Sequence, residues 1–159
     1  MGKILVQFLA LLSLSAIVTL GGSPARAADC DAPKPDFRIA APAASVGAAA
    51  AAFSGVWAGN WTFTVRVGSS RGNAVECNIV HISVKDDQSA KVVDCVGSLT
   101  ELNQGPRCDA FDAKINNGEL SFTAVNGSVR SFRLAGPGTL AAQSINRQNK
   151  TNTTELHRQ

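Results

Sequence analysis

The stretch that decides the fold is residues 53–67, which read FSGVWAGNWTFTVRV. From residue 57 onward its odd positions are apolar or glycine, while its even positions from residue 60 onward are polar. The odd set is Trp57, Gly59, Trp61, Phe63, Val65 and Val67, and the even set is Asn60, Thr62, Thr64 and Arg66. A period of two is typical of a β-strand that buries one face and exposes the other to water. A strand this long predicts a curved partner surface that buries its apolar face.

The rest of the chain supplies that surface as short alternating segments separated by turn residues. The expected strands cover residues 75–84, 89–96, 108–115, 129–134, 139–145 and 152–157, with a further strand directly after Asn117-Gly118. Eight strands in consecutive hairpins predict an all-β fold, an antiparallel eight-stranded up-and-down barrel. Closure removes both sheet edges and gives Trp57 and Trp61 an interior. An open sandwich of the same strands is the alternative.

Two asparagine–glycine pairs fix the register of the middle strands. Asn117-Gly118 is typical of a two-residue hairpin loop. That loop sets apolar residues opposite one another on one face: Ile115 with Leu120, Ala113 with Phe122, and Phe111 with Ala124. At Asn126-Gly127 the apolar pattern instead predicts a three-residue loop with Gly127 as a left-handed bulge, which sets Leu120 opposite Phe132.

Residues 1–27 have the features of a secretory signal peptide. They contain Lys3, an apolar run from Ile4 to Leu20, and the small-x-small site Ala25-Arg26-Ala27. We expect cleavage after Ala27 and a bacterial periplasmic or secreted location. An uncleaved membrane anchor is the alternative, but the run contains polar residues and no stop-transfer flank follows it. The mature chain is therefore expected to have no transmembrane segment.

The mature chain divides into an arm and one domain. Residues 28–52 are rich in Pro and Ala and predict a flexible arm, because they have little apolar area to bury. Residues 53–159 form the predicted barrel domain, which is long enough for a single core. Loss of Lys3 and Arg26 leaves 13 Lys and Arg against 12 Asp and Glu. This balance, without interleaved aromatic residues, does not predict nucleic-acid binding, and no cofactor is expected.

Four cysteines remain after cleavage, and in an exported chain an even number predicts two disulfides. A β-turn centred on Asp86 sets Cys77 opposite Cys95, which favours that pair and leaves Cys30 with Cys108 to staple the arm. A bond between Cys95 and Cys108 is the main rival. No metal site is expected, because there is no close cysteine pair and no histidine at ligand spacing.

The sequence lacks the parts of an enzyme. Its only histidines are His81 and His157, and the cluster of Ser83, His81 and Asp86 does not give the geometry of a nucleophile and its base. We therefore predict a protein that is not an enzyme and has no catalytic residues.

The opening of the first strand carries a resemblance. Gly55-Val56-Trp57 resembles the Gly-x-Trp signature of lipocalin barrels. The longer pattern Phe53-x-Gly55-x-Trp57-x-Gly59-x-Trp61 is similar to that of small bacterial exported barrels of calycin type. The resemblance implies that Trp57 closes the barrel floor and that Arg158 lies across it, with Gly55 in a structural role.

A second resemblance is to periplasmic inhibitors of secreted metalloproteases, which are exported barrels with a Gly-x-Trp start and a flexible N-terminal arm. It implies that residues 28–52 serve as an inhibitory arm and that Cys77 with Cys95 is the disulfide between early strands.

The candidate ligand-binding residues are those predicted to point inward. They are Trp61, Phe63, Phe111, Phe122 and Phe132, with Arg130 at the barrel mouth, where it could meet an anionic group. The alternative is that these aromatic side chains simply fill the core. We predict an exported binding protein that takes a small apolar ligand in or at the mouth of the barrel. The alternatives are a protein-binding barrel that acts through residues 28–52 and a structural envelope protein.

Overall fold

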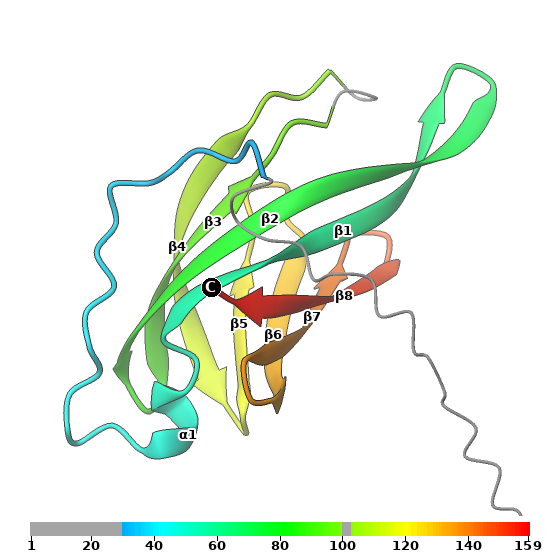
Figure 1. The fold of residues 1–159 in the computed structure, drawn as a ribbon. Coiled ribbons are helices and arrows are strands. Elements are labelled where there is room, and N and C mark those ends of the chain that lie inside the picture. The colour runs from blue at the N-terminus through cyan, green and yellow to red at the C-terminus, as the bar shows by residue number, and fades with distance from the viewer. Residues whose placement is uncertain (1–29, 100–102) are drawn as a thin grey trace, which may run out of the picture.

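The computed structural model describes residues 30–99 and 103–159, which form one closed antiparallel barrel with its strands in sequential order (Figure 1). The elements are α1 (Ala48–Ala51), β1 (Gly55–Val67), β2 (Ser70–Asp86), β3 (Ser89–Val96), β4 (Arg107–Asn116), β5 (Glu119–Thr123), β6 (Val129–Gly136), β7 (Thr139–Ile145) and β8 (Thr151–Arg158). The predicted eight-stranded up-and-down barrel is confirmed, and the open sandwich is wrong. The predicted signal peptide, residues 1–27, lies outside the described residues.

The barrel closes over a short seam between β1 and β8. The paired residues are Trp57 with Arg158, Ala58 with His157, and Gly59 with Leu156. A side chain at Gly59 would collide with the backbone of Glu155, so this close approach requires glycine. Beyond the seam β1 and β8 separate, and Figure 1 shows the β1–β2 hairpin extending past the end of the barrel.

The inward face of the strands forms a packed core. Trp57 and Trp61 are 0% and 1% exposed, as the period of two in β1 predicted. The rings of Phe111 and Phe122 stack with centroids 4.6 Å apart, and those of Phe122 and Phe132 stack at 5.9 Å. The core therefore fills the lumen with the chain's own side chains over most of its depth.

The floor of the barrel is closed by Arg158. Its guanidinium lies 4.2 Å from the ring centroid of Trp57 and donates hydrogen bonds to the carbonyls of Ser54 at 2.7 Å and Ala52 at 2.6 Å. The indole of Trp57 donates to the carbonyl of Phe53 at 2.9 Å. This is the arrangement that the calycin resemblance implied for Trp57 and Arg158.

The registers predicted from the asparagine–glycine pairs are confirmed. Ile115 lies opposite Leu120, and Leu120 lies opposite Phe132. Gly127 has φ +78° in a three-residue loop, whose end is closed by a hydrogen bond from the amide of Ala124 to the carbonyl of Ser128. The β4–β5 ladder holds three residue pairs. The two further predicted pairs, Ala113 with Phe122 and Phe111 with Ala124, are not among them.

The register predicted between β2 and β3 is wrong by two residues. Ile79 lies opposite Cys95, whereas the amide of Gly97 donates to the carbonyl of Cys77 at 2.9 Å. The turn lies at Asp87 and Gln88, and the register shifts between Val84 and Asp86. The preferred pair of Cys77 with Cys95 is therefore wrong, as is Cys30 with Cys108.

The disulfides are Cys30–Cys77 and Cys95–Cys108. The second is the rival considered from the sequence, and it joins residues directly opposite one another on β3 and β4. The first staples the N-terminal segment to β2, as expected for Cys30, but with a different partner.

Residues 30–52, here called the strap, lie along the outer face of β2 and β3 (Figure 1). Ala32 is buried in an outer cluster with Ile79 and Val93, and the amide of Ala40 donates to the hydroxyl of Ser83 at 3.2 Å. These contacts do not fit the prediction of a flexible arm over the described part of residues 28–52. Because the strap covers their outer face, β2 and β3 are buried on both faces for much of their length.

Candidate binding site at the barrel mouth

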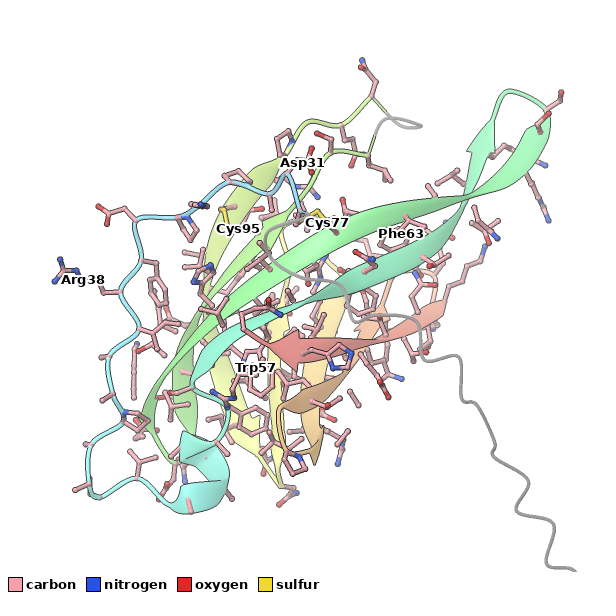
Figure 2. The ribbon with its side chains drawn as sticks, viewed as in Figure 1. Asp31, Arg38, Trp57, Phe63, Cys77 and Cys95 are labelled. Carbon is pink, nitrogen blue, oxygen red and sulfur yellow. A yellow bond between two sulfur atoms is a disulfide. The ribbon has the colours of Figure 1, made fainter. Side chains whose placement is uncertain are left out.

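The predicted ligand residues divide between three places. Trp61, Phe122 and Phe132 belong to the packed core. Phe63 lies on the extended half of β1, the part of that strand beyond its pairing with β8, as Figure 2 shows. There it lines a groove beside the strand. Phe111 and Arg130 line a cavity at the mouth, which we define as the barrel end opposite α1.

The mouth cavity has a volume of about 240 Å³. Its walls come from the end of β3, the start of β4, the β5–β6 loop and the start of β6, and they include Asp94, Arg107, Asp109, Phe111, Val125 and Arg130. The volume is below the range of about 300–1,000 Å³ that is typical of drug-sized ligands. The cavity therefore suits a small molecule.

A buried polar network forms the base of this cavity. The guanidinium of Arg130 makes an ion pair with Asp94, and both side chains are less than one-tenth exposed. The amide of Asn78 donates to Asp94 at 2.7 Å and to the carbonyl of Cys95 at 2.9 Å. The indole of Trp61 donates to the side-chain oxygen of Asn78 at 3.1 Å. The network joins β1, β2, β3 and β6 and holds Arg130 in one place.

Arg130 has a buried hydrogen-bonding atom without a partner among the described residues. Its Nε is buried and makes no hydrogen bond with the described residues. The guanidinium also lies 5.7 Å from the ring centroid of Trp61. A buried donor without an acceptor is costly, so this atom is a local weak point of the network.

Two carboxyl groups near Arg130 are perturbed by burial. Burial raises the pKa of Asp94, although the charge of Arg130 and the hydrogen bond from Asn78 oppose the shift. Burial also raises the pKa of Glu76, against the opposing charges of Arg107 and Arg130. The mouth thus contains two arginines beside carboxyl groups whose charged form is disfavoured.

Glu76, Asn78 and Asp94 were missed as site residues. Each has the sequence parity of the inward-facing residues of its strand, with Val80 and Ile82 on β2 and Val92 on β3. Polar residues at inward positions on neighbouring strands are the signal that could have revealed the network.

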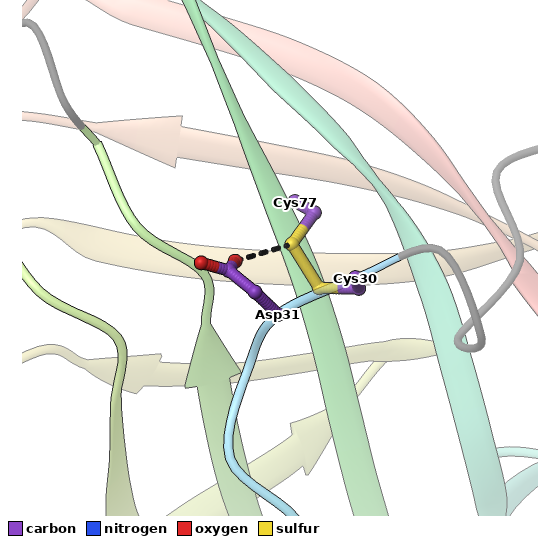
Figure 3. A group of neighbouring side chains, drawn as sticks. All are labelled: Cys30, Asp31 and Cys77. Atoms are coloured by element: carbon purple, nitrogen blue, oxygen red, sulfur yellow. Dashed lines mark hydrogen bonds between the residues drawn. A yellow bond between two sulfur atoms is a disulfide. The ribbon is translucent and has the colours of Figure 1, made fainter.

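The strap is fixed beside the mouth by Cys30–Cys77, as Figure 3 shows. Asp31 accepts a hydrogen bond from the amide of Ser98 at 2.9 Å, and hydrogen bonds from Ser98 lower the pKa of Asp31. One oxygen of Asp31 also lies 3.6 Å from the sulfur of Cys77. Although these three side chains bring ligand atoms within 4.8 Å, both sulfurs are in a disulfide and offer no thiolate to a metal ion.

Two residues of the rejected catalytic cluster, His81 and Ser83, contact the strap, and the third, Asp86, belongs to the β2–β3 turn. His81 meets the edge of Phe37 at 6.4 Å between ring centroids, and burial lowers the pKa of His81. The hydroxyl of Ser83 accepts its hydrogen bond from Ala40, while Asp86 accepts hydrogen bonds within the β2–β3 turn. These three side chains therefore have structural partners in the described part of the chain.

Comparison with known proteins gives no relative: no family model, no curated protein and no solved structure matches this chain. The resemblances to calycin barrels and to metalloprotease inhibitors stay predictions. Among the described residues, no helix has the length and apolar character needed to span a membrane.

Proposed function

We propose that this protein is an exported, non-enzymatic binding protein that takes a small amphipathic ligand at the barrel mouth. The single observation that carries the proposal is the convergence of Phe111 and Arg130 on one cavity. The aromatic ring offers an apolar contact, and the guanidinium offers a charge-assisted hydrogen bond to an anionic group. The two disulfides support a periplasmic or secreted location, because such bonds persist in oxidising compartments.

The packed core limits where the ligand can lie. Trp61, Phe122 and Phe132 are packed in the core below the mouth, so they support the site from beneath without lining it. The ligand's apolar part would lie against Phe111 and against Val125, a residue that is 72% exposed. Its anionic group would lie toward Arg130 and Arg107.

Binding through an arm has less support. The strap is fixed by Cys30–Cys77, by Asp31 with Ser98, and by a hydrogen bond of 2.6 Å from the amide of Gly47 to Asp87. Insertion of this segment into a protease would require most of these contacts to break.

The test is a titration of the full mature chain with phenylacetate and with its neutral analogue phenylacetamide, followed by amide NMR shifts. We expect saturable shifts at Phe111, Val125 and Arg130, with phenylacetate at least tenfold tighter. The variant Phe111→Ala should lose binding. Phe63→Ala, which removes a half-buried aromatic ring outside the cavity, should keep it. Equal affinity for both probes, or no shift at the mouth, would reject the proposal.

A further inference from the structure

The extended half of β1 leaves a strand edge uncovered. The β1–β8 ladder ends at Gly59 and Leu156, but β1 continues to Val67 and is paired there with β2 alone. At the point of separation, the hydroxyl of Thr154 donates to the carbonyl of Asn60 at 2.6 Å, where a continued ladder would bring a backbone amide. Residues 62–67 therefore present one edge without a strand partner among the described residues.

Two hydrogen bonds show which residues of β1 direct their backbone groups toward the uncovered edge. The carbonyl of Val56 accepts from the amide of Gln159, and that of Asn60 accepts from Thr154. Even-numbered residues of β1 thus direct their backbone groups toward β8. It follows that Thr62, Thr64 and Arg66 present their amides and carbonyls along the uncovered edge.

A groove lies along this edge. It has a volume of about 780 Å³ and is bounded by residues 63–66 of β1, by Arg71, and by residues of the β7–β8 connection that include Asn146, Gln148 and Lys150. Its apolar contribution comes from Phe63 and Val65, which are on the inward face of β1. The groove is thus apolar on the inward side of the strand and polar on the other.

The charged side chains among the described residues of the groove are Arg66, Arg71 and Lys150, all of them positive. Arg66 and Arg71 lie directly opposite each other across the β1–β2 ladder, an arrangement of like charges that is unfavourable without an anion. Neither arginine, nor Lys150, takes part in the ion pairs found in residues 30–99 and 103–159. The described residues of the lining include no Asp or Glu.

We propose that this groove binds an extended acidic peptide segment of a partner protein, which adds to β1 as a further antiparallel strand. The occupant has alternating apolar and acidic side chains over about six residues, matching residues 62–67. Its apolar side chains contact the Phe63 and Val65 side of the sheet, and its carboxylates lie beside Arg66 and Arg71. This site is separate from the mouth cavity and does not depend on the ligand proposed for it.

The probe is a fluorescein-labelled peptide of alternating glutamate and valine, about eight residues long, followed by anisotropy with the full mature chain. We expect saturable binding that weakens as salt is raised, because exposed charges are screened. A peptide with lysine in place of glutamate should not bind. A glutamate–valine peptide N-methylated at alternate residues, which lacks the amides that would face β1, should bind at least tenfold more weakly.

Two protein variants separate charge from backbone pairing. Arg66→Gln with Arg71→Gln should weaken binding at least tenfold, whereas Arg133→Gln, which removes an exposed arginine from β6, should not. Thr64→Pro deletes an edge amide that has no strand partner in the described part of the chain, so it should leave the melting temperature nearly unchanged and weaken binding at least tenfold.

The proposal is overturned by three results. The first is no binding of the acidic peptide to the wild-type chain. The second is equal binding of the N-methylated peptide, which would mean that the groove attracts the peptide by charge without pairing with its backbone. The third is a concentration-dependent dimer in sedimentation that the acidic peptide does not dissociate, which would mean that a second copy occupies the edge. If Thr64→Pro fails to fold, the N-methylated peptide still tests whether the bound peptide pairs with the backbone of β1.

Discussion

Asp94 of β3 and Arg130 of β6 form an ion pair inside the barrel, and the amide of Asn78 donates to the same carboxylate. Removing two opposite charges from water costs hydration free energy, and their mutual attraction only partly offsets that cost. Their importance therefore lies in what happens when one partner is removed.

Asp94→Asn should lower the free energy of unfolding by about 3–5 kcal/mol, because it leaves the charge of Arg130 buried and uncompensated. Urea denaturation at pH 7 measures this change. The double variant Asp94→Leu with Arg130→Met replaces the pair with apolar side chains and should recover most of the loss. A cost below about 1 kcal/mol for Asp94→Asn would show that Arg130 is solvated in the folded chain.

The effect of Glu76→Gln on the melting temperature, measured as a function of pH, tests the electrostatics of the mouth. Burial raises the pKa of Glu76 above its ordinary value of 4.5, so the folded chain binds this proton more tightly than the unfolded chain does. The contribution of Glu76 to stability is therefore present below pH 4.5 and is lost as pH rises through the raised value. At pH 7 the Gln variant should melt at a higher temperature than the wild type, and the difference should vanish toward pH 4.

The control is Glu155→Gln on the exposed face of β8, which should change the melting temperature little at either pH. If Glu76→Gln destabilises the protein at pH 7, the charged form of Glu76 is favoured in the folded chain.

The barrel was predictable because its strands alternate cleanly and its middle turns have strong local preferences. Asn117 and Gly118 both adopt positive φ, at 49° and 73°, which few other residue pairs tolerate. The turn after β2 has no such pair. Its position is set by Asp86, which accepts hydrogen bonds from the amide of Gln88 at 2.9 Å and the hydroxyl of Ser89 at 2.7 Å.

The error in the β2–β3 register was invisible to the apolar pattern. A slip of one residue moves every side chain to the opposite face, but a slip of two moves none. Val92 points inward in either register, opposite Val80 in the predicted one and Ile82 in the structure. The predicted cysteine pairing depended on the register itself and was therefore wrong.

The site was only partly predictable because alternation shows which way a side chain points but not how much space it fills. Arg130 was placed inward correctly, at 6% exposed. The stacking of Phe111, Phe122 and Phe132, next to which the mouth cavity lies, depends on ring positions that alternation does not encode.

The two disulfides should differ in their effect on the strap. Cys30–Cys77 spans 47 residues and Cys95–Cys108 spans 13, so loop closure predicts contributions of about 4 and about 3 kcal/mol, respectively. Replacing the first pair with serine should also release the strap. Trypsin should then cut within minutes after the exposed Arg38, which points away from the barrel in Figure 2.

Replacing Cys95 and Cys108 with serine is the matched control, because it leaves the strap attached. Trypsin should then cut after Arg38 as slowly as in the wild type. Equal cleavage of the two double variants would mean that the non-covalent contacts of the strap are sufficient to hold it.

Gly97 explains why Cys77 can accept Cys30 as its partner. A β-carbon at position 97 would collide with the sulfur of Cys77 and with the carboxylate of Asp31. Gly97→Ala should therefore slow formation of Cys30–Cys77 during oxidative refolding and leave Cys95–Cys108 unaffected. Mass mapping of disulfides at timed intervals measures both bonds. Equal rates of formation in wild type and variant would contradict the steric argument.

Gly55 and Arg158 should be coupled in stability. Gly55 has φ +146°, and a β-carbon there would collide with the guanidinium of Arg158. Gly55→Ala should cost about 1–3 kcal/mol from backbone strain and displacement of Arg158. Arg158→Lys should cost about 1–3 kcal/mol, because an ammonium group cannot reproduce the fork that reaches the carbonyls of Ser54 and Ala52 while covering Trp57.

A double-mutant cycle measured by urea denaturation tests that coupling. Since both changes act on the same guanidinium, the double variant should cost less than the sum of the single variants. Arg133→Lys, at an exposed ion pair with Glu119, should change stability by less than about 0.5 kcal/mol and serves as the control. Strict additivity of Gly55→Ala and Arg158→Lys would mean that the floor of the barrel does not depend on the contact between these two residues.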